Sequence, residues 1–171
     1  MSLTESEYTV LRQTVATRGT VRITLLPVTV LAWAGLTTAL VIFSQLRIDV
    51  LFPLAILVAG FEAIHALHVG AERIGRYLQV FYEGDLDGPR WETTAMAVGP
   101  ALPGGGVDPL FTVIFVCATV LNLLPGLLPR PTLLEIGIIT ALQAAFLLRL
   151  LRPRVAAARP RRGGQWGFRA V

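Results

Sequence analysis

Side chains of the kinds that bind metals, haem or protons cluster in the segment FEAIHALH, residues 61–68, which contains Glu62, His65 and His68. Glu-x-x-His is the spacing that di-iron carboxylate proteins place on one helix face. A carboxylate and two imidazoles are suitable ligands for a divalent metal, and Glu72 lies one helical turn further on. Glu62, His65, His68 and Glu72 are therefore the predicted metal ligands, although a di-iron site needs a second Glu-x-x-His pair that the chain lacks.

His65 and His68 are also candidates for binding a haem or a chlorophyll-type pigment, because imidazole is a common axial ligand of tetrapyrroles. They are the only two histidines of the chain and lie on one predicted helix. A haem held by histidine on both faces would therefore need a second copy or a partner's ligand. A single axial bond would need His65 alone.

The same groups have the order expected of a proton relay. Each can exchange protons with the next group one turn along, from Glu62 through the histidines to Glu72. The preceding part of the predicted helix, VLFPLAILVAG at residues 50–60, contains no polar side chain that could carry protons through the outer half of the membrane. A complete transport path is therefore not predicted.

A structural interpretation competes with these chemical ones. Polar residues recur every three or four positions, so they share one face of a helix. This polar stripe consists of Glu62, His65, His68, Glu72, Arg76, Gln79 and Glu83. Such stripes are more often packing surfaces than active sites.

We therefore expect the start of the stripe to hydrogen-bond within the protein. Glu62 and His65 would bond to each other or to a neighbouring helix, and Glu72 would pair with His68 and with Arg76. The rest of the stripe would dock on another protein. The predicted partner-binding residues are Glu72, Arg76, Gln79 and Glu83.

The elements that carry these residues are predicted to be membrane helices. The 171 residues are 54% hydrophobic and 15% charged, with a mean hydropathy of +0.65. This composition exposes too much apolar surface for an ordinary soluble domain. Four segments have the roughly 20 apolar residues that a membrane-spanning helix needs, at about 25–46, 50–71, 109–129 and 131–151.

These segments predict an all-α integral membrane protein, a four-helix bundle. The fourth helix is predicted to begin at Thr132, because Thr132 and Glu135 have the spacing of a capping box. The second helix, if it continues from Val50 to Glu83, is about 50 Å long against a hydrocarbon core of about 30 Å. It would then project into the cytoplasm as a stalk.

The arginines predict the orientation. With both termini in the cytoplasm, thirteen arginines lie inside and two, Arg47 and Arg130, lie outside. This is a strong positive-inside bias. We therefore predict a multi-pass protein of the bacterial inner (plasma) membrane with cytoplasmic N- and C-termini.

The chain divides into three parts. Residues 1–24 are a cytoplasmic segment with a short amphipathic helix over 4–18 that Gly19 ends. Residues 25–152 form the membrane domain, whose stalk and cytoplasmic loop cover 72–108, with a short helix around 91–98. Residues 153–171 are a basic tail suited to anionic lipid or a partner protein, without a fold for nucleic-acid binding.

No signature of a soluble enzyme is present, and the chain more closely fits a role other than catalysis. The predicted function is an accessory or scaffolding subunit of a larger inner-membrane complex. Its partners would be membrane lipid and other membrane-protein subunits or a second copy, and not nucleic acid. The alternatives are a tetrapyrrole- or metal-binding electron-transfer or catalytic subunit, and a small proton-coupled transporter.

Overall fold

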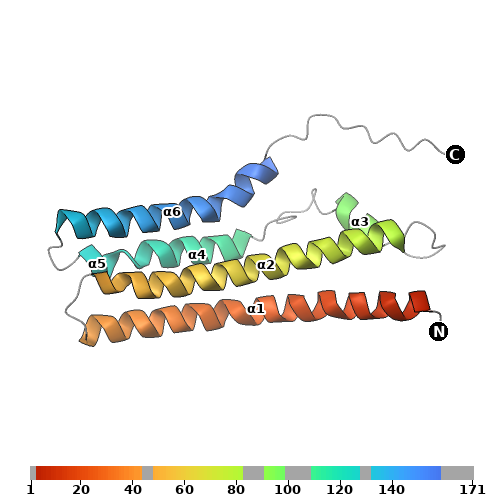
Figure 1. Ribbon diagram of the computed structural model, residues 1–171, viewed down its shortest axis with the longest axis horizontal. Helices are drawn as coiled ribbons and strands as arrows, with labels where there is room; N and C mark the ends of the chain where they lie inside the picture. The colour runs from red at the N-terminus through yellow and green to blue at the C-terminus, as the bar shows by residue number, and fades with distance from the viewer. Residues whose placement is uncertain (1–2, 44–47, 83–90, 99–108, 128–131, 159–171) are drawn as a thin grey trace.

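The computed structural model describes residues 3–43, 48–82, 91–98, 109–127 and 132–158, and these ranges are helical apart from short turns and contain no strand. The predicted all-α class is confirmed. The elements are α1 (Leu3–Phe43), η1 (Ile48–Val50), α2 (Leu51–Phe81), α3 (Trp91–Val98), α4 (Pro109–Leu121), α5 (Leu124–Leu127) and α6 (Leu133–Ala158) (Figure 1).

The long helices lie side by side (Figure 1). Helix α1 lies along one side and packs chiefly against α2, with α4 beyond α2 and α6 along the opposite side. The start of α1, the end of α2 and the short α3 lie toward one end of the molecule, and α6 runs toward that end but stops well short of it. Three helical stretches are long and apolar enough to cross a membrane: Glu5–Phe43, Ile48–Phe81 and Leu133–Leu151. They agree with the expected membrane protein.

The third predicted span, 109–129, is not one continuous helix, and as a membrane span it stays a prediction. Helix α4 ends at Leu121, and a turn separates it from α5. Pro125 explains the break, because proline has no N–H and its ring clashes with the carbonyl four residues earlier, here that of Leu121. The backbone tightens instead, with the Leu123 N–H bonded to the Val120 carbonyl at 3.1 Å.

The short N-terminal helix is also wrong, because α1 is one helix of 41 residues that continues through Gly19. A glycine inside a helix costs only about 1 kcal/mol relative to alanine. Residues on both sides of Gly19 are held by contacts to the rest of the protein, such as those of Arg12 and Arg22 described below. Packing on α2 therefore outweighs the local preference to stop.

Helix α2 continues through Gly70 and Gly75, as the stalk prediction requires. These glycines leave room for neighbouring side chains. A Cβ at Gly70 would meet the guanidinium of Arg18 from α1, and one at Gly75 would lie 2.9 Å from Oε2 of Glu92 from α3. The short helix predicted around 91–98 is confirmed as α3.

A hydrophobic core joins α2, α4 and α6. The ring of Phe61 makes edge-on contacts with Phe115 and Phe146, at centroid distances of 5.5 and 5.9 Å. Just after the end of α4, the buried amide of Asn122 accepts a hydrogen bond from the Trp33 indole and donates one to the Val50 carbonyl, both at 3.0 Å. These contacts fix the depth of α4 relative to α1 and α2.

The predicted capping box at the start of α6 is confirmed. The Thr132 N–H donates to Glu135 Oε2 at 2.7 Å, and the Glu135 N–H donates to Thr132 Oγ1 at 3.3 Å. Glu135 therefore stabilises the helix start.

Candidate functional site: the polar stripe of α2

Glu62 forms an ion pair with Arg149 of α6. Arg149 donates from Nη2 to Glu62 Oε2 at 2.9 Å, and its Nε lies 2.8 Å from Oε1, so the guanidinium contacts both carboxylate oxygens as in a strong charge-assisted pair. The guanidinium also lies 5.7 Å from the centre of the Phe61 ring. The expected bond from Glu62 to a neighbouring helix is therefore present.

Arg149 was not expected at this site, because sequence reasoning used it only as one of many cytoplasmic arginines. A signal was present. Arg149 is the one charged residue inside the apolar stretch LLRLL, residues 147–151. A charge in such a position is usually paired.

His68 connects α1 to α2. Arg22 of α1 lies with Nη1 3.1 Å from His68 Nδ1, and a guanidinium can only donate, so Nδ1 accepts. The other ring nitrogen, Nε2, lies 3.4 Å from Glu72 Oε1, which confirms the predicted His68–Glu72 pair. The predicted Glu72–Arg76 pair is absent among the described side chains. Arg22 also stacks over the ring of Phe111 from α4, at 4.5 Å.

His65 is half-buried and is not bonded to Glu62. Its ring stacks on that of Phe61, with centroids 5.9 Å apart and planes 4° apart. Within the described ranges, no hydrogen bond reaches its imidazole nitrogens. Among the stripe residues, it is therefore the imidazole that remains available for a ligand.

The four predicted metal ligands share a helix face but do not converge. In the part of the chain that the structure describes, no three side chains of the His, Cys, Asp and Glu types are placed to hold a metal ion. To bind a metal, Glu62 would have to give up its two contacts with Arg149, and His68 would have to give up its contact with Arg22. The metal and tetrapyrrole interpretations stay predictions.

The outer part of the stripe is accessible. Glu72 and Arg76 are exposed and Gln79 is half-buried, whereas Glu83 lies outside the described residues. The exposed aromatic and apolar side chains on this part of α2 lie next to the stripe, on the side of Arg76. We define the stalk face as Arg73, Arg76, Tyr77, Val80 and Phe81, all exposed.

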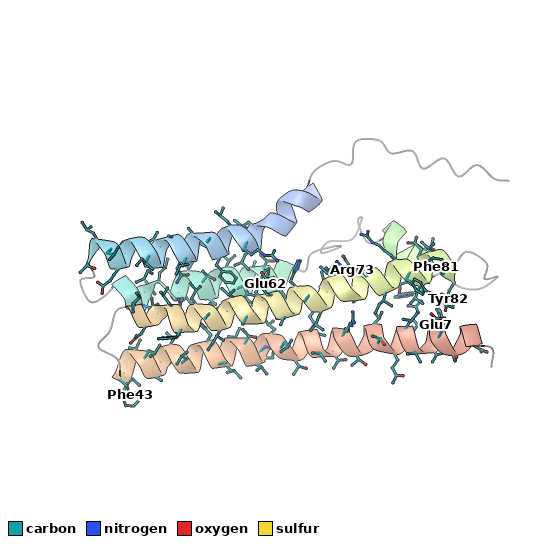
Figure 2. The ribbon with its side chains drawn as sticks, viewed as in Figure 1. Glu7, Phe43, Glu62, Arg73, Phe81 and Tyr82 are labelled. Atoms are coloured by element: carbon teal, nitrogen blue, oxygen red, sulfur yellow. The ribbon has the colours of Figure 1, made fainter. Side chains whose placement is uncertain are left out.

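Figure 2 shows Arg73 and Phe81 on the part of α2 that continues beyond α4. The predicted partner-binding residues included Arg76 but not Arg73, Tyr77, Val80 or Phe81. Their spacing of three and four residues was the signal, because it places them on one side of a helix.

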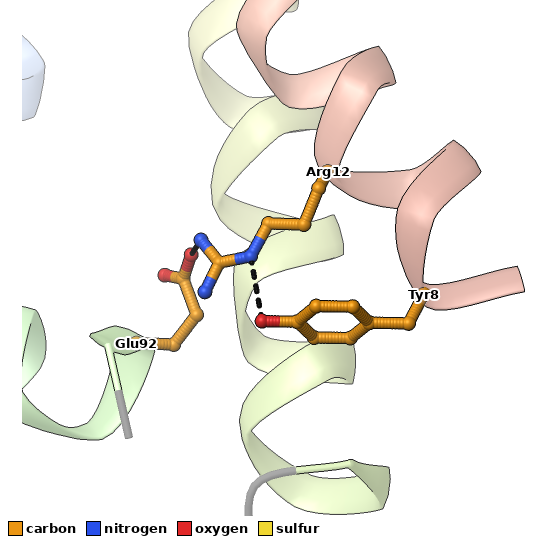
Figure 3. A network of polar contacts seen from close by, with 3 residues as sticks. All are labelled: Tyr8, Arg12 and Glu92. Carbon is orange, nitrogen blue, oxygen red and sulfur yellow. Dashed lines mark hydrogen bonds and ion pairs between the residues drawn. The ribbon is translucent and has the colours of Figure 1, made fainter. Parts of the chain in front are cut away.

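Polar contacts hold this end of the molecule together. Arg12 of α1 donates from Nη1 to Glu92 Oε1 of α3 at 2.8 Å and from Nε to the Tyr8 hydroxyl at 3.0 Å (Figure 3). Glu7 of α1 accepts a hydrogen bond from Tyr77 of α2 at 3.3 Å. The ends of α1, α2 and α3 therefore form one connected unit.

Glu7 also acts on Tyr82, which follows α2. A hydrogen bond to the Glu7 carboxylate, with smaller effects of burial and of the negative charge, raises the pKa of Tyr82 to about 12. The Tyr82 ring also lies 5.7 Å from that of Tyr8. Neutral Tyr82 is thus part of the contact between α1 and α2.

No family model, curated protein or solved structure matches this chain. Function is therefore inferred from its own side chains and their contacts.

Proposed function

We propose that this chain is an accessory or scaffolding subunit of a larger membrane complex and that it binds a partner through the stalk face. The observation that carries the proposal is a division of roles along α2. The groups suited to chemistry, Glu62 and His68, are paired with arginines of other helices. The exposed apolar and aromatic side chains gather where α2 extends past the apolar core.

The chain would cross the membrane four times, through α1, α2, α4 with α5, and α6. The uncharged part of α1, residues 23–43, is about 31 Å long, which matches a hydrocarbon core of about 30 Å. An even number of crossings agrees with the directions of the helices, because α6 runs back toward the end of the molecule at which α1 starts (Figure 1). The arginine bias supports a cytoplasmic location of that end, in an inner membrane.

The stalk face lies outside the membrane in this arrangement. Helix α2 is about 46 Å long, so about 15 Å of it extends past a core of about 30 Å. There Val80 is 67% exposed and Phe81 66% exposed, and Trp91 of the adjoining α3 is 64% exposed. Large apolar side chains grouped on a surface mark interaction sites, because burying them is favourable by about 25 cal/mol per Å².

The chemistry of the face indicates its partner. Arg73 and Arg76 are exposed and, among the described side chains, neither has an acidic partner. They lie beside Tyr77, Val80 and Phe81, so a complementary surface would combine apolar side chains with Asp or Glu. The basic tail, residues 153–171, begins within the last turns of α6 and would add contacts with that partner or with anionic lipid headgroups.

Site-specific photocrosslinking in native membranes tests this proposal. A photoreactive residue in place of Val80 should give one defined adduct whose partner peptide contains acidic residues. The same residue in place of Thr9, which is exposed on α1, should not give that adduct. Arg76→Glu should remove the adduct while leaving the chain folded. Crosslinking to lipid alone, or an adduct that is insensitive to Arg76→Glu, would contradict the proposal.

The second candidate function is that of a subunit that binds a tetrapyrrole through His65. The observation in its favour is that, among the described residues, no side chain forms a hydrogen bond with the His65 imidazole. It predicts a visible absorption band that His65→Ala removes. The transporter alternative has less support, because Glu62 would have to exchange protons while bonded twice to Arg149. It predicts that Glu62→Gln abolishes uptake without changing assembly.

A further inference from the structure

The outward side of α1 carries a seven-residue repeat that the stalk proposal does not use. We define the α1 seam as Val10, Thr14, Thr17, Val21, Thr24, Val28, Leu31, Gly35, Thr38 and Ile42. Successive members are four and three residues apart, which is the spacing of a coiled-coil interface. All are exposed except Thr14, which is half-buried.

The seam contains no charge, although it extends far beyond the apolar part of α1. Residues 3–22 continue about 30 Å past the uncharged stretch. A free helix face in water normally carries charged side chains. Here the arginines point elsewhere: Arg12 bonds to α3, Arg18 lies against Gly70, and Arg22 bonds to His68.

The polar groups of the seam are already satisfied. Each of its four threonines donates its hydroxyl to the carbonyl four residues earlier in α1, at distances of 2.8 to 3.0 Å. Thr17, for example, donates to Gln13 at 2.9 Å. A partner surface would therefore meet methyl groups and would leave no hydroxyl donor unpaired.

We propose that the α1 seam is a homodimer interface, at which α1 pairs in parallel with α1 of a second copy. Copies inserted in the same orientation are related by a twofold axis along the membrane normal, so each seam residue faces its own counterpart. Such pairing excludes charged residues from the seam, because like charges would meet. The seam meets this requirement over its entire length.

The residues beside the seam agree with self-pairing. One flank consists of Gln13, Thr20, Pro27, Ala34 and Val41, none of which is charged. Within the seam, Val21, Val28 and Ile42 occupy the position of the repeat at which β-branched residues favour two strands.

The seam is long enough for a specific interface. From Val10 to Ile42 it extends about 50 Å, and a contact strip about 10 Å wide would cover about 500 Å² per copy. The total of about 1,000 Å² reaches the lower limit of specific protein interfaces. Among the described residues, no atom of another helix lies within 4 Å of a Cβ placed on Gly35, so this position also allows two helices to approach closely inside the membrane.

Disulfide crosslinking tests the geometry. In a chain without its natural cysteine, by Cys117→Ser, we would introduce Thr17→Cys or Val21→Cys and treat native membranes with a mild oxidant. Both should give crosslinked dimers at least about tenfold more efficiently than Ala16→Cys, since disulfide formation needs Cβ atoms within about 4.5 Å. Ala16 is exposed on the same helix but off the seam. Equal crosslinking at all three positions, or adducts with a different protein, would overturn the proposal.

A charge substitution tests the energetics. Val21→Arg places two arginines opposite each other, which should raise the dimer Kd about a hundredfold or more. Ala16→Arg should leave the Kd unchanged. Association of labelled copies in lipid vesicles measures both, and helix content checks that each variant is folded. An unchanged Kd for Val21→Arg would refute the α1 seam as the interface.

Discussion

Removal of the Glu62–Arg149 pair gives a sensitive test of where this part of the bundle lies. The pair has two contacts, of 2.8 and 2.9 Å, between α2 and α6. Its side chains are 44% and 35% exposed, so the energy of the pair depends on what surrounds them. By helical rise, Glu62 is about 16 Å from the start of α2, which places it within the proposed hydrocarbon layer.

The two possible surroundings predict different free energies. In water, an exposed ion pair contributes about 0.2–1 kcal/mol, because water and salt screen the charges. In a medium of low dielectric constant, removal of one partner costs about 3–5 kcal/mol, because the other charge is left unpaired. We therefore expect Glu62→Gln or Arg149→Gln alone to lower the free energy of unfolding by about 3 kcal/mol or more. The double variant should lose much less than the sum of the two.

Reversible unfolding of the chain in lipid discs provides the assay, as a double-mutant cycle. The expected coupling energy is about 2–3 kcal/mol or more, since neighbouring charges in a pair are not additive. Arg73→Gln, at an exposed position on the stalk face, is the control and should change stability by less than about 0.5 kcal/mol. A coupling energy below about 1 kcal/mol would refute the placement of this pair inside the membrane.

Two further predictions concern packing and pH. A Cβ at Gly60 would overlap Thr29 of α1, 2.8 Å from its Cβ, so Gly60→Ala should destabilise the chain by about 1–2 kcal/mol despite a better helix propensity. A Cβ at Gly137 would lie in open space, so Gly137→Ala should stabilise the chain by up to about 1 kcal/mol in the same unfolding assay. Equal changes in stability for Gly60→Ala and Gly137→Ala would contradict the close contact of Gly60 with Thr29. Because the pKa of Tyr82 is raised to about 12, its contribution to stability is complete below pH of about 10 and is lost between about 10 and 12. Alkaline titration of tyrosinate absorbance checks this, and an unchanged value in Glu7→Gln would contradict the assigned cause.

Local sequence patterns predicted the features that depend on neighbouring residues. The capping box of Thr132 and Glu135, the short helix at 91–98 and the His68–Glu72 pair are all determined within one or two helical turns. Hydropathy predicted the long apolar helices because a membrane-spanning helix is recognised from its own run of about 20 apolar residues, without knowledge of its neighbours.

Features that depend on which helices touch were not predictable in this way. Arg149 is 87 residues from Glu62, and only the packing of α6 beside α2 brings them together. The continuity of α1 through Gly19 depends on tertiary contacts that outweigh a modest local cost. The stalk face was missed because the exposure of Tyr77 and Val80 depends on which helices pack around that part of α2.

Native mass spectrometry of the assembly, released from membranes with its lipids, tests the central claim most directly, because it weighs subunits and cofactors together. We expect complexes that contain at least one other membrane protein and that lose it on Arg76→Glu. A chain that is released without any other protein would contradict the scaffolding proposal. A bound tetrapyrrole or metal that His65→Ala removes would make the polar stripe a cofactor site instead.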